Sequence, residues 1–285
     1  MALNVTYGVS TWLWTSPFQT SSIEELFPKI AAMGFDAVEI AVEDPAVIDG
    51  AAVKAGLEKY KLKAIICGAF GPTRDLTHED PAVHENCFKY IEACLDFCML
   101  WDIKIFAGPM YSAVGKARMV PPEQRVKEWQ LAVKNLRIVA EMAAKRGIKL
   151  AIEPLNRFES DLVNTVKDAL RMVNDINHPA VGILLDGFHM NIEERDVEAA
   201  IKLAGDKLLH IQVSENYRGS PGTGQTRWDA FKSGLDAVNY EGIVAIESFT
   251  PEIKELAEAV CIWYPFADSQ DDFASEGLAF LKTYF

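Results

Sequence analysis

Several short apolar runs in this chain end on an oxygen-bearing side chain, and that repeated ending constrains the fold more than any other feature. The run at 150–152, for example, stops at Glu153 and turns at Pro154, as a buried strand would. Three later runs follow the same pattern, and the polar residues of the four runs are Glu153, Asp186, Gln212 and Glu247. Because parallel strands have their C-terminal ends at one edge, we expect these four side chains to meet.

Strand and helix patterns alternate along the whole chain, at about 30 to 40 residues per unit. We expect strands at 5–12, 37–40, 62–67, 103–107, 150–153, 181–186, 208–213 and 243–247. Helices are expected at 22–33, 51–60, 81–101, 121–146, 166–176, 197–204, 228–238 and 275–284. An open doubly wound sheet would gather its ligands at one switch point, commonly after a glycine-rich first turn, whereas here strands five to eight all contribute. The sequence therefore predicts a single (β/α)₈ TIM barrel over residues 1–285.

Composition narrows the partners of this barrel. The formal charge of −13 and the lack of a basic stripe argue against a nucleic-acid partner. No apolar run is long enough to span a bilayer, and the N-terminus lacks a signal-peptide pattern, so we expect a cytoplasmic protein without a membrane partner. Of the five cysteines, Cys94 and Cys98 are expected to pack in the core, whereas Cys67 stands at a strand end where it could line a site.

The four converging side chains have the chemistry of a divalent-metal site. Three carboxylates and one amide form an all-oxygen set, which favours Mn²⁺ or Mg²⁺ over Zn²⁺, with Co²⁺ as a further candidate. Two residues before Gln212, on the same face of its strand, His210 could donate to a carboxylate behind the ligands. Three carboxylates carry more negative charge than one divalent ion neutralises, and this surplus favours a proton on one glutamate.

A glutamate that is both a ligand and a base can remove a proton from carbon next to a carbonyl while the metal holds the enediolate oxygens. Two such glutamates, Glu153 and Glu247, could act on opposite faces of the substrate, which would make the protein an epimerase. Return of the proton to the neighbouring carbon would instead make it an aldose–ketose isomerase. The ligand set alone does not separate these outcomes.

At these residues the chain resembles the metal-dependent ketose 3-epimerases, the D-tagatose and D-allulose 3-epimerase group of the xylose isomerase-like barrels. The resemblance extends over nearly the whole chain and rests on the motifs IEPLNRFE at 152–159, DGFHMN at 186–191, SENYRG at 214–219, PGTG at 221–224 and IESF at 246–249. It implies that Glu153 and Glu247 are ligands and the acid–base pair, and that Asp186 is a ligand. It also implies that substrate oxygens are held by Glu159, His189 and Arg218.

One position departs from that family pattern. The 3-epimerases have a histidine ligand where this chain has Gln212, and the hydroxypyruvate isomerases of the same superfamily are similar to this chain in using glutamine. A hydroxypyruvate-type isomerase is therefore an alternative. A lyase acting on 3-keto-glycosides is another, because it begins with the same enolisation, and a non-catalytic sugar-binding protein is the last.

Further expectations concern the substrate and the assembly. Trp12, Trp14 and Phe249 are candidates for an apolar wall beside a sugar, with one or two of them facing it. The surrounding acidity opposes a phosphate dianion, although the glycines at 222–224 follow the seventh strand, near where barrels often seat phosphate. The resemblance implies a homodimer or homotetramer, with the apolar run at 260–266 as an interface if it is exposed.

Overall fold

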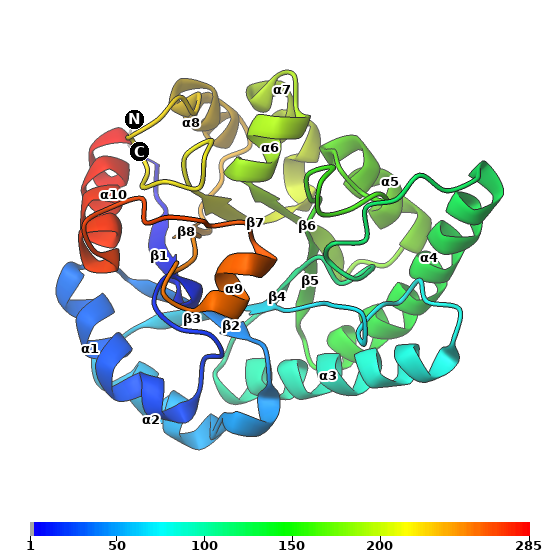
Figure 1. The fold of residues 1–285 in the computed structure, drawn as a ribbon, viewed down its shortest axis with the longest axis horizontal. Helices are drawn as coiled ribbons and strands as arrows, with labels where there is room; N and C mark the ends of the chain where they lie inside the picture. The colour runs from blue at the N-terminus through cyan, green and yellow to red at the C-terminus, as the bar shows by residue number, and fades with distance from the viewer. Residues whose placement is uncertain (1–2) are drawn as a thin grey trace.

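Eight parallel strands close into a barrel in the computed structural model, which describes residues 3–285. The strands pair in sequence order, and β1 pairs with β8 to close the ring (Figure 1). Their bounds are β1 Thr6–Ser10, β2 Ala37–Val42, β3 Lys63–Gly68, β4 Ile105–Gly108, β5 Lys149–Ile152, β6 Val181–Asp186, β7 Leu208–Val213 and β8 Ile243–Ile246. This arrangement confirms the (β/α)₈ barrel predicted from the alternating pattern.

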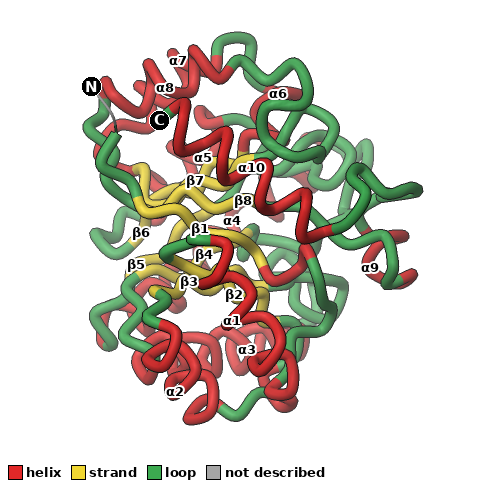
Figure 2. Tube along the Cα trace, turned by 90° about the vertical axis from the view of Figure 1, so that its left-hand side faces the viewer, coloured by secondary structure: helices red, strands yellow, loops and turns green. Residues whose placement is uncertain are grey.

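Helices surround the barrel, and ten α-helices lie within residues 3–285. They are α1 Ile23–Met33, α2 Gly50–Tyr60, α3 Pro81–Leu100, α4 Pro122–Lys145, α5 Val166–Ile176, α6 Gly187–Glu193, α7 Val197–Ala204, α8 Trp228–Ala237, α9 Lys254–Ala259 and α10 Gln270–Tyr284. The expected number of eight was too low, because α6 and α9 are too short to produce a helical hydrophobic period. Both follow strand ends and lie at the same end of the barrel (Figures 1 and 2).

Helix ends agree with local chemistry in most units. Thr165 precedes α5, and its hydroxyl accepts a hydrogen bond from the backbone of Asp168 at 3.2 Å. The Asp168 carboxylate in turn accepts a hydrogen bond from the backbone N–H of Thr165 at 3.1 Å, which completes a capping box. The last helix, α10, begins five residues earlier than expected because Ser269 caps it by accepting from the backbone of Asp272.

The strands are buried on both faces, as helix-covered parallel strands must be, and β2 and β6 are buried at every position. A small apolar cluster made of Ile65, Ala107, Ala151 and Leu184 lies apart from the main core. Three of its members stand two residues before Cys67, Glu153 and Asp186, so by strand alternation they point to the same side, one layer deeper. This cluster forms an apolar floor under the polar mouth of the barrel.

Leu3, the first described residue, lies beside the C-terminal Phe285. The backbone N–H of Leu3 donates to the carbonyl of Phe285 at 2.6 Å, next to the β1–β8 seam. None of the helices in residues 3–285 has the length and hydropathy needed to cross a membrane.

Candidate active site

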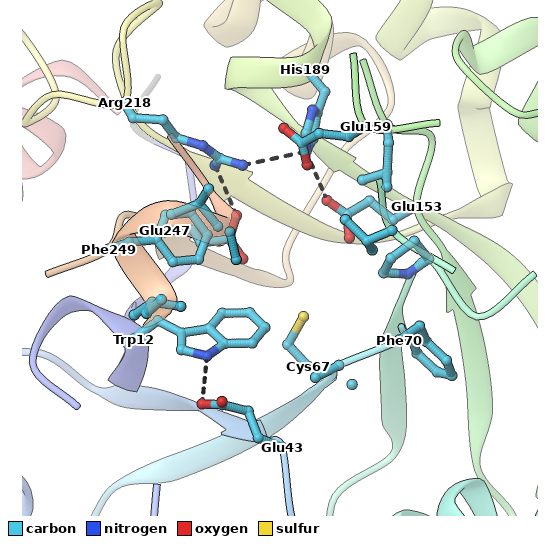
Figure 3. A pocket seen from close by; sticks show the side chains of 18 residues that line it. Trp12, Glu43, Cys67, Phe70, Glu153, Glu159, His189, Arg218, Glu247 and Phe249 are labelled. Carbon is cyan, nitrogen blue, oxygen red and sulfur yellow. Dashed lines mark hydrogen bonds and ion pairs between the residues drawn. The ribbon is translucent and has the colours of Figure 1, made fainter. Parts of the chain in front are cut away.

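A cavity of about 220 Å³ opens at the C-terminal ends of the strands, where the four polar residues were expected to converge. Figure 3 shows this cavity with its lining side chains. Its polar wall includes Glu153, Glu159, His189, Arg218 and Glu247. Five of the seven predicted site residues therefore line one cavity, and Asp186 and Gln212 lie directly behind it, side by side in the β6–β7 register.

The three carboxylates expected to bind metal are buried and gather around one guanidinium. Arg218 Nη1 donates to Asp186 Oδ2 at 2.6 Å and to Glu247 Oε2 at 2.8 Å. On the other side, His189 Nε2 lies 3.5 Å from Glu153 Oε1 and 3.7 Å from Asp186 Oδ2. The structure therefore brings Glu153, Asp186 and Glu247 together, with Arg218 and His189 bridging them.

Arg218 reaches this position from a tight turn after β7. Its backbone N–H donates to the carbonyl of Glu215 at 2.9 Å, and its own carbonyl accepts from Ser248 Oγ at 2.7 Å. The residue has φ of 66°, a left-handed conformation uncommon for side chains other than glycine and asparagine. The Glu215 carboxylate in the same turn does not bond to Arg218, because it accepts from Trp228 and two backbone N–H groups instead.

Gln212 is held in one orientation by two carboxylates. Its Nε2 donates to Glu39 Oε1 and to Glu247 Oε1, both at 2.9 Å. Exchange of the amide nitrogen and oxygen would place an oxygen against two carboxylates, so the hydrogen bonds fix the assignment. The amide Oε1 is buried and has no hydrogen-bond partner among residues 3–285. Its lone pairs are therefore free to meet a further donor or a cation.

Glu39 was not identified from the sequence, although it is fully buried at the base of the site. It lies in the middle of β2, where it accepts from His210 Nε2 at 2.6 Å and from Gln212. The expectation that His210 contacts a carboxylate behind the ligands is thereby confirmed. The available signal was a lone charge inside the apolar run AVEIAV, which a buried parallel strand tolerates only with partners.

The protonation state of His189 follows from its neighbours. Its Nδ1 accepts the backbone N–H of Asn156 at 3.1 Å, so that nitrogen carries no proton and Nε2 carries one in the neutral ring. Burial lowers the pKa of His189, and the nearby Arg218 lowers it further against the opposing effect of Asp186. His189 is thus neutral and presents Nε2–H toward Glu153 and Asp186, and the 3.3 Å approach of Arg218 Nη2 to Nε2 is then a contact between two donors.

The buried carboxylates differ in their preferred charge. Burial raises the pKa of Glu153 well above its usual range, and the charge of Asp186 raises it further. Burial also raises the pKa of Glu247, because the opposing effect of Arg218 is too small to offset it. For Asp186, burial is outweighed by Arg218 and His189, and its pKa is lowered. Without a further cation the site thus favours protons on its two glutamates.

This donor set fits a divalent cation. Oxygens of Glu153 and Asp186 lie within 4.8 Å of each other, the surplus carboxylates lack a second positive charge, and Gln212 Oε1 has no partner among residues 3–285. His189 completes this group by distance, but neither of its ring nitrogens is free, because Nδ1 accepts a bond and Nε2 carries the proton. A second group within that distance, formed by Glu39, Cys67 and Glu247, is a poorer candidate because the Gln212 amide nitrogen already bonds to all three. The four-residue ligand set stays a prediction.

The opposite wall of the cavity is largely apolar. Trp12 and Phe249 line it with ring centroids 5.5 Å apart, and Cys67 also lines it. Trp14 does not, because its Nε1 donates to Asp271 on α10 at 2.7 Å. Of the three aromatic candidates, two therefore face the cavity. Phe70 and Glu43 are among the lining residues that sequence reasoning missed.

Comparison with known proteins first defines the class. The family model described as xylose isomerase-like TIM barrel matches residues 27–284, so the chain belongs to that family. Within it, the chain is 34% identical to a probable ketose 3-epimerase of Synechocystis, over 98% of this chain and 96% of the relative. An L-ribulose 3-epimerase of Methylomonas is 30% identical, over 97% and 96%. The chain is accordingly a ketose 3-epimerase-like enzyme of the isomerase class, as the motifs indicated.

Solved structures agree with this placement. The D-allulose 3-epimerase of Methylomonas, crystallised with D-allulose, superposes with a TM-score of 0.91 at 29% identity, covering 100% of this chain and 98% of that one. A 3-dehydro-D-guloside 4-epimerase of Escherichia coli is 31% identical over 81% of this chain and 88% of the relative. The proteins to which this chain is similar thus include both a 3-epimerase and a 4-epimerase.

Proposed function

We propose that this protein epimerises unphosphorylated ketoses at carbon 3 with the help of a divalent metal. The observation that carries the proposal is the pair of buried glutamates, Glu153 and Glu247, which lie at the ends of β5 and β8 on facing sides of the cavity (Figure 3). Burial raises the pKa of both glutamates, so each holds a proton more readily than an exposed glutamate does.

The residues would divide the reaction as follows. One glutamate, ionised, accepts the proton from carbon 3, and the electron pair of that C–H bond moves toward the neighbouring carbonyl oxygen. Arg218 and His189 Nε2–H are placed to donate hydrogen bonds to oxygens that gain charge. The other glutamate, protonated, delivers its proton to the opposite face of carbon 3. This exchange inverts the carbon and leaves the two glutamates with reversed protonation.

The metal would be held by Glu153, Asp186, Gln212 Oε1 and Glu247, and the all-oxygen set supports Mn²⁺ or Mg²⁺, with Co²⁺ as a further candidate. A bound divalent cation supplies Lewis acidity that stabilises the negative charge of the enediolate. Glu159 accepts from Asn156 Nδ2 at 2.7 Å and lines the cavity, which supports its role in holding a substrate hydroxyl beside His189 and Arg218.

Proton exchange in D₂O, followed by NMR, tests this proposal. The Mg²⁺-loaded protein is incubated with a panel of ketoses, hydroxypyruvate and one 3-oxo-glycoside. We expect deuterium at carbon 3 together with the epimeric ketose, and a loss of about 10²- to 10⁴-fold in rate for Glu247→Gln. The exposed Glu255→Gln on α9 serves as the matched control and keeps full activity.

Each other result names a different function. An aldehyde product would identify an aldose–ketose or hydroxypyruvate-type isomerase, and a released aglycone would identify a lyase. Sugar binding without exchange at any carbon would identify a non-catalytic sugar-binding protein. Any of these three outcomes overturns carbon-3 epimerisation.

A second candidate is epimerisation of a 3-keto-glycoside at carbon 4, supported by the similarity to the 3-dehydro-D-guloside 4-epimerase. The same two glutamates would act on a C–H bond beside a carbonyl, with the carbonyl one position further along the sugar. Deuterium at carbon 4 of the 3-oxo-glycoside, without exchange in free ketoses, would select this function.

We also propose that residues 1–285 form one domain, that the protein acts in the cytoplasm, and that it assembles as a homodimer or homotetramer. Five free cysteines, four of them buried, support a reducing compartment. Exposed aromatic residues in the predicted interface support assembly, since Trp263 is 68% and Tyr264 63% exposed. Ile262 is buried instead, in a cluster with Phe249 and Leu256.

A further inference from the structure

Glu43 is a charged residue on the part of the cavity wall that the first four strands contribute, away from Glu153 and Glu247. Glu43 comes directly after β2, just as Glu153 comes directly after β5 and Glu247 after β8. It is the one charged lining residue contributed by the β1–β4 half of the described barrel. The rule that identified the other carboxylates at strand ends therefore applies to Glu43 as well, and its role needs its own explanation.

The contacts of Glu43 fix its carboxylate without using it fully. Trp12 Nε1 donates to Oε1 at 2.9 Å, and Ser16 Oγ donates to Oε2 at 2.8 Å (Figure 3). A carboxylate offers about four lone-pair sites, so each oxygen can accept another hydrogen bond. Within residues 3–285 no lysine, arginine or histidine forms an ion pair with Glu43.

Nearby groups do not satisfy the remaining capacity. Arg74 is the basic residue that acts on Glu43 electrostatically, but its guanidinium stacks on Tyr90 at 3.8 Å and donates to the carbonyl of Ala69. Phe70 and Val114 are among the apolar residues that line the same cavity. Burial there raises the pKa of Glu43 despite the bonds from Ser16 and Trp12. A further hydrogen bond would therefore stabilise this half-buried carboxylate.

We infer that Glu43 accepts a hydrogen bond from a hydroxyl group on the far end of the substrate, the part that extends beyond the reacting carbons. Glu153, Glu247, Arg218 and His189 hold one end of the cavity, so a sugar whose carbon 3 lies between the glutamates places its remaining hydroxyls on the Glu43 side. This orientation rests on the proposed function. The site then selects neutral, hydroxylated ketoses and disfavours a phosphate at that end, because Glu43 would repel it.

The test is a cycle between one variant and two ligands. D-allulose has three carbons beyond carbon 3, and 1,3-dihydroxyacetone has none. Binding is measured by calorimetry with Mn²⁺ present, in a Glu247→Gln background that prevents turnover. A hydrogen bond to a charged group is stronger than one to a neutral group. We therefore expect Glu43→Gln to lower the affinity for D-allulose about tenfold. The same substitution should change the affinity for dihydroxyacetone less than twofold.

Two controls separate this role from others. The exposed Glu255→Gln makes the same change of charge outside the cavity and should alter neither affinity. Trp12→Phe removes the indole N–H that donates a hydrogen bond to Glu43, but it leaves an aromatic ring at this position. If Glu43 acts only by holding Trp12, Trp12→Phe will reproduce the loss seen with Glu43→Gln, and the inference is wrong. Equal weakening of both ligands by Glu43→Gln would also overturn it.

Failure of the inference can be told apart from failure of the proposed function. With Glu247 intact, Glu43→Gln should raise the KM for D-allulose about tenfold and leave kcat within about threefold, because the hydroxyl is held equally in the ground and transition states. Absence of deuterium exchange in the unaltered protein would remove the proposed function, while the calorimetric cycle would still decide on Glu43. Exchange with an unchanged KM in Glu43→Gln would remove only the inference.

Discussion

At the scale of single residues, the contacts of Gln212 fit the ligand position for which the resemblance to the 3-epimerases implies a histidine. An imidazole has one ring nitrogen for a metal and a second for an orienting partner. The amide achieves the same division, because its nitrogen bonds Glu39 and Glu247 and its oxygen is left without a partner. Glu39 therefore acts as the group that orients the proposed ligand.

Replacement of Gln212 by leucine tests that role. The side chain keeps a similar volume but loses the oxygen and both donated hydrogen bonds, so we expect Mn²⁺ affinity to fall about 10- to 100-fold. Titration followed by electron paramagnetic resonance of free Mn²⁺ gives the affinity directly. Gln225→Leu, the same substitution at an exposed position in the loop after β7, is the control and should bind Mn²⁺ normally. Unchanged affinity in Gln212→Leu would remove Gln212 from the ligand set.

Sequence reasoning was successful for residues whose position in the chain determines where they point. Glu153, Asp186 and Glu247 could be identified because a carboxylate at the end of a buried parallel strand must face the mouth of the barrel. Glu39 lies in the middle of β2. A charged residue there can be a buried functional group, or it can mean that the segment is not a buried strand, and the sequence pattern does not distinguish the two. The contacts of Arg218 depend on a turn and on Ser248, thirty residues away, which no local pattern reveals.

At the scale of elements, the loops that surround the mouth are tied together by buried ion pairs. Lys116, in the loop between β4 and α4, lies 2.9 Å from Asp75 Oδ2 in the loop after β3 and 3.6 Å from Glu128 on α4. Asp75 also accepts from the hydroxyl and the backbone of Thr77. This network links three segments that periodicity analysis describes separately, and it explains why α4 packs where it does.

Removal of the lysine should destabilise the protein in a pH-dependent manner. Lys116→Met leaves the buried Asp75 carboxylate without its cation, whereas Glu128 keeps its ion pair with Arg118 at 2.8 Å. We expect a loss of about 2 kcal/mol in the free energy of unfolding at pH 7. For Asp75, burial is outweighed by Lys116 and Thr77, so its pKa lies below the ordinary 3.8. A lowered pKa contributes stability above the unfolded value and loses it as pH falls through the folded value. The difference between the two proteins should therefore shrink below about pH 4.

Urea unfolding at pH 7 and pH 3 measures this difference. Lys127→Met is the matched control, because its ion pair with Glu79 is exposed on both sides and contributes little. An equal loss of stability at both pH values would show that Lys116 acts through packing of its aliphatic chain and not through its charge.

The two elements that the sequence did not indicate, α6 and α9, both belong to the mouth. Seven and six residues long, they are shorter than two full turns and show no amphipathic repeat. Asp186 caps α6 by accepting from the backbone of Phe188 at 2.8 Å, so one carboxylate ends a strand, begins a helix and faces the site. The barrel itself was predictable because eight units repeat one pattern, whereas its mouth is built from unrepeated segments.

At the scale of the whole molecule, the proposed assembly can be assigned to one surface. The segment 260–266, predicted to be an interface if it is exposed, contains both buried and exposed residues. Ile262 is buried, whereas Trp263 and Tyr264 are exposed. Phe266 packs edge-on against Tyr264 at 5.3 Å and against Tyr217 at 5.4 Å. Tyr217 immediately precedes Arg218, so this aromatic surface adjoins the loop that positions the guanidinium.

Replacement of both exposed aromatic residues by serine tests whether this surface holds subunits together. The unaltered protein should sediment as a dimer or tetramer, and Trp263→Ser with Tyr264→Ser should reduce its mass, because desolvated aromatic side chains carry much of the energy of an interface. Met119→Ser is the control, since Met119 is fully exposed in the loop between β4 and α4. An unchanged mass for the double variant would place the interface elsewhere. If the subunits do separate, a KM that rises for D-allulose would show that assembly also steadies the Arg218 loop.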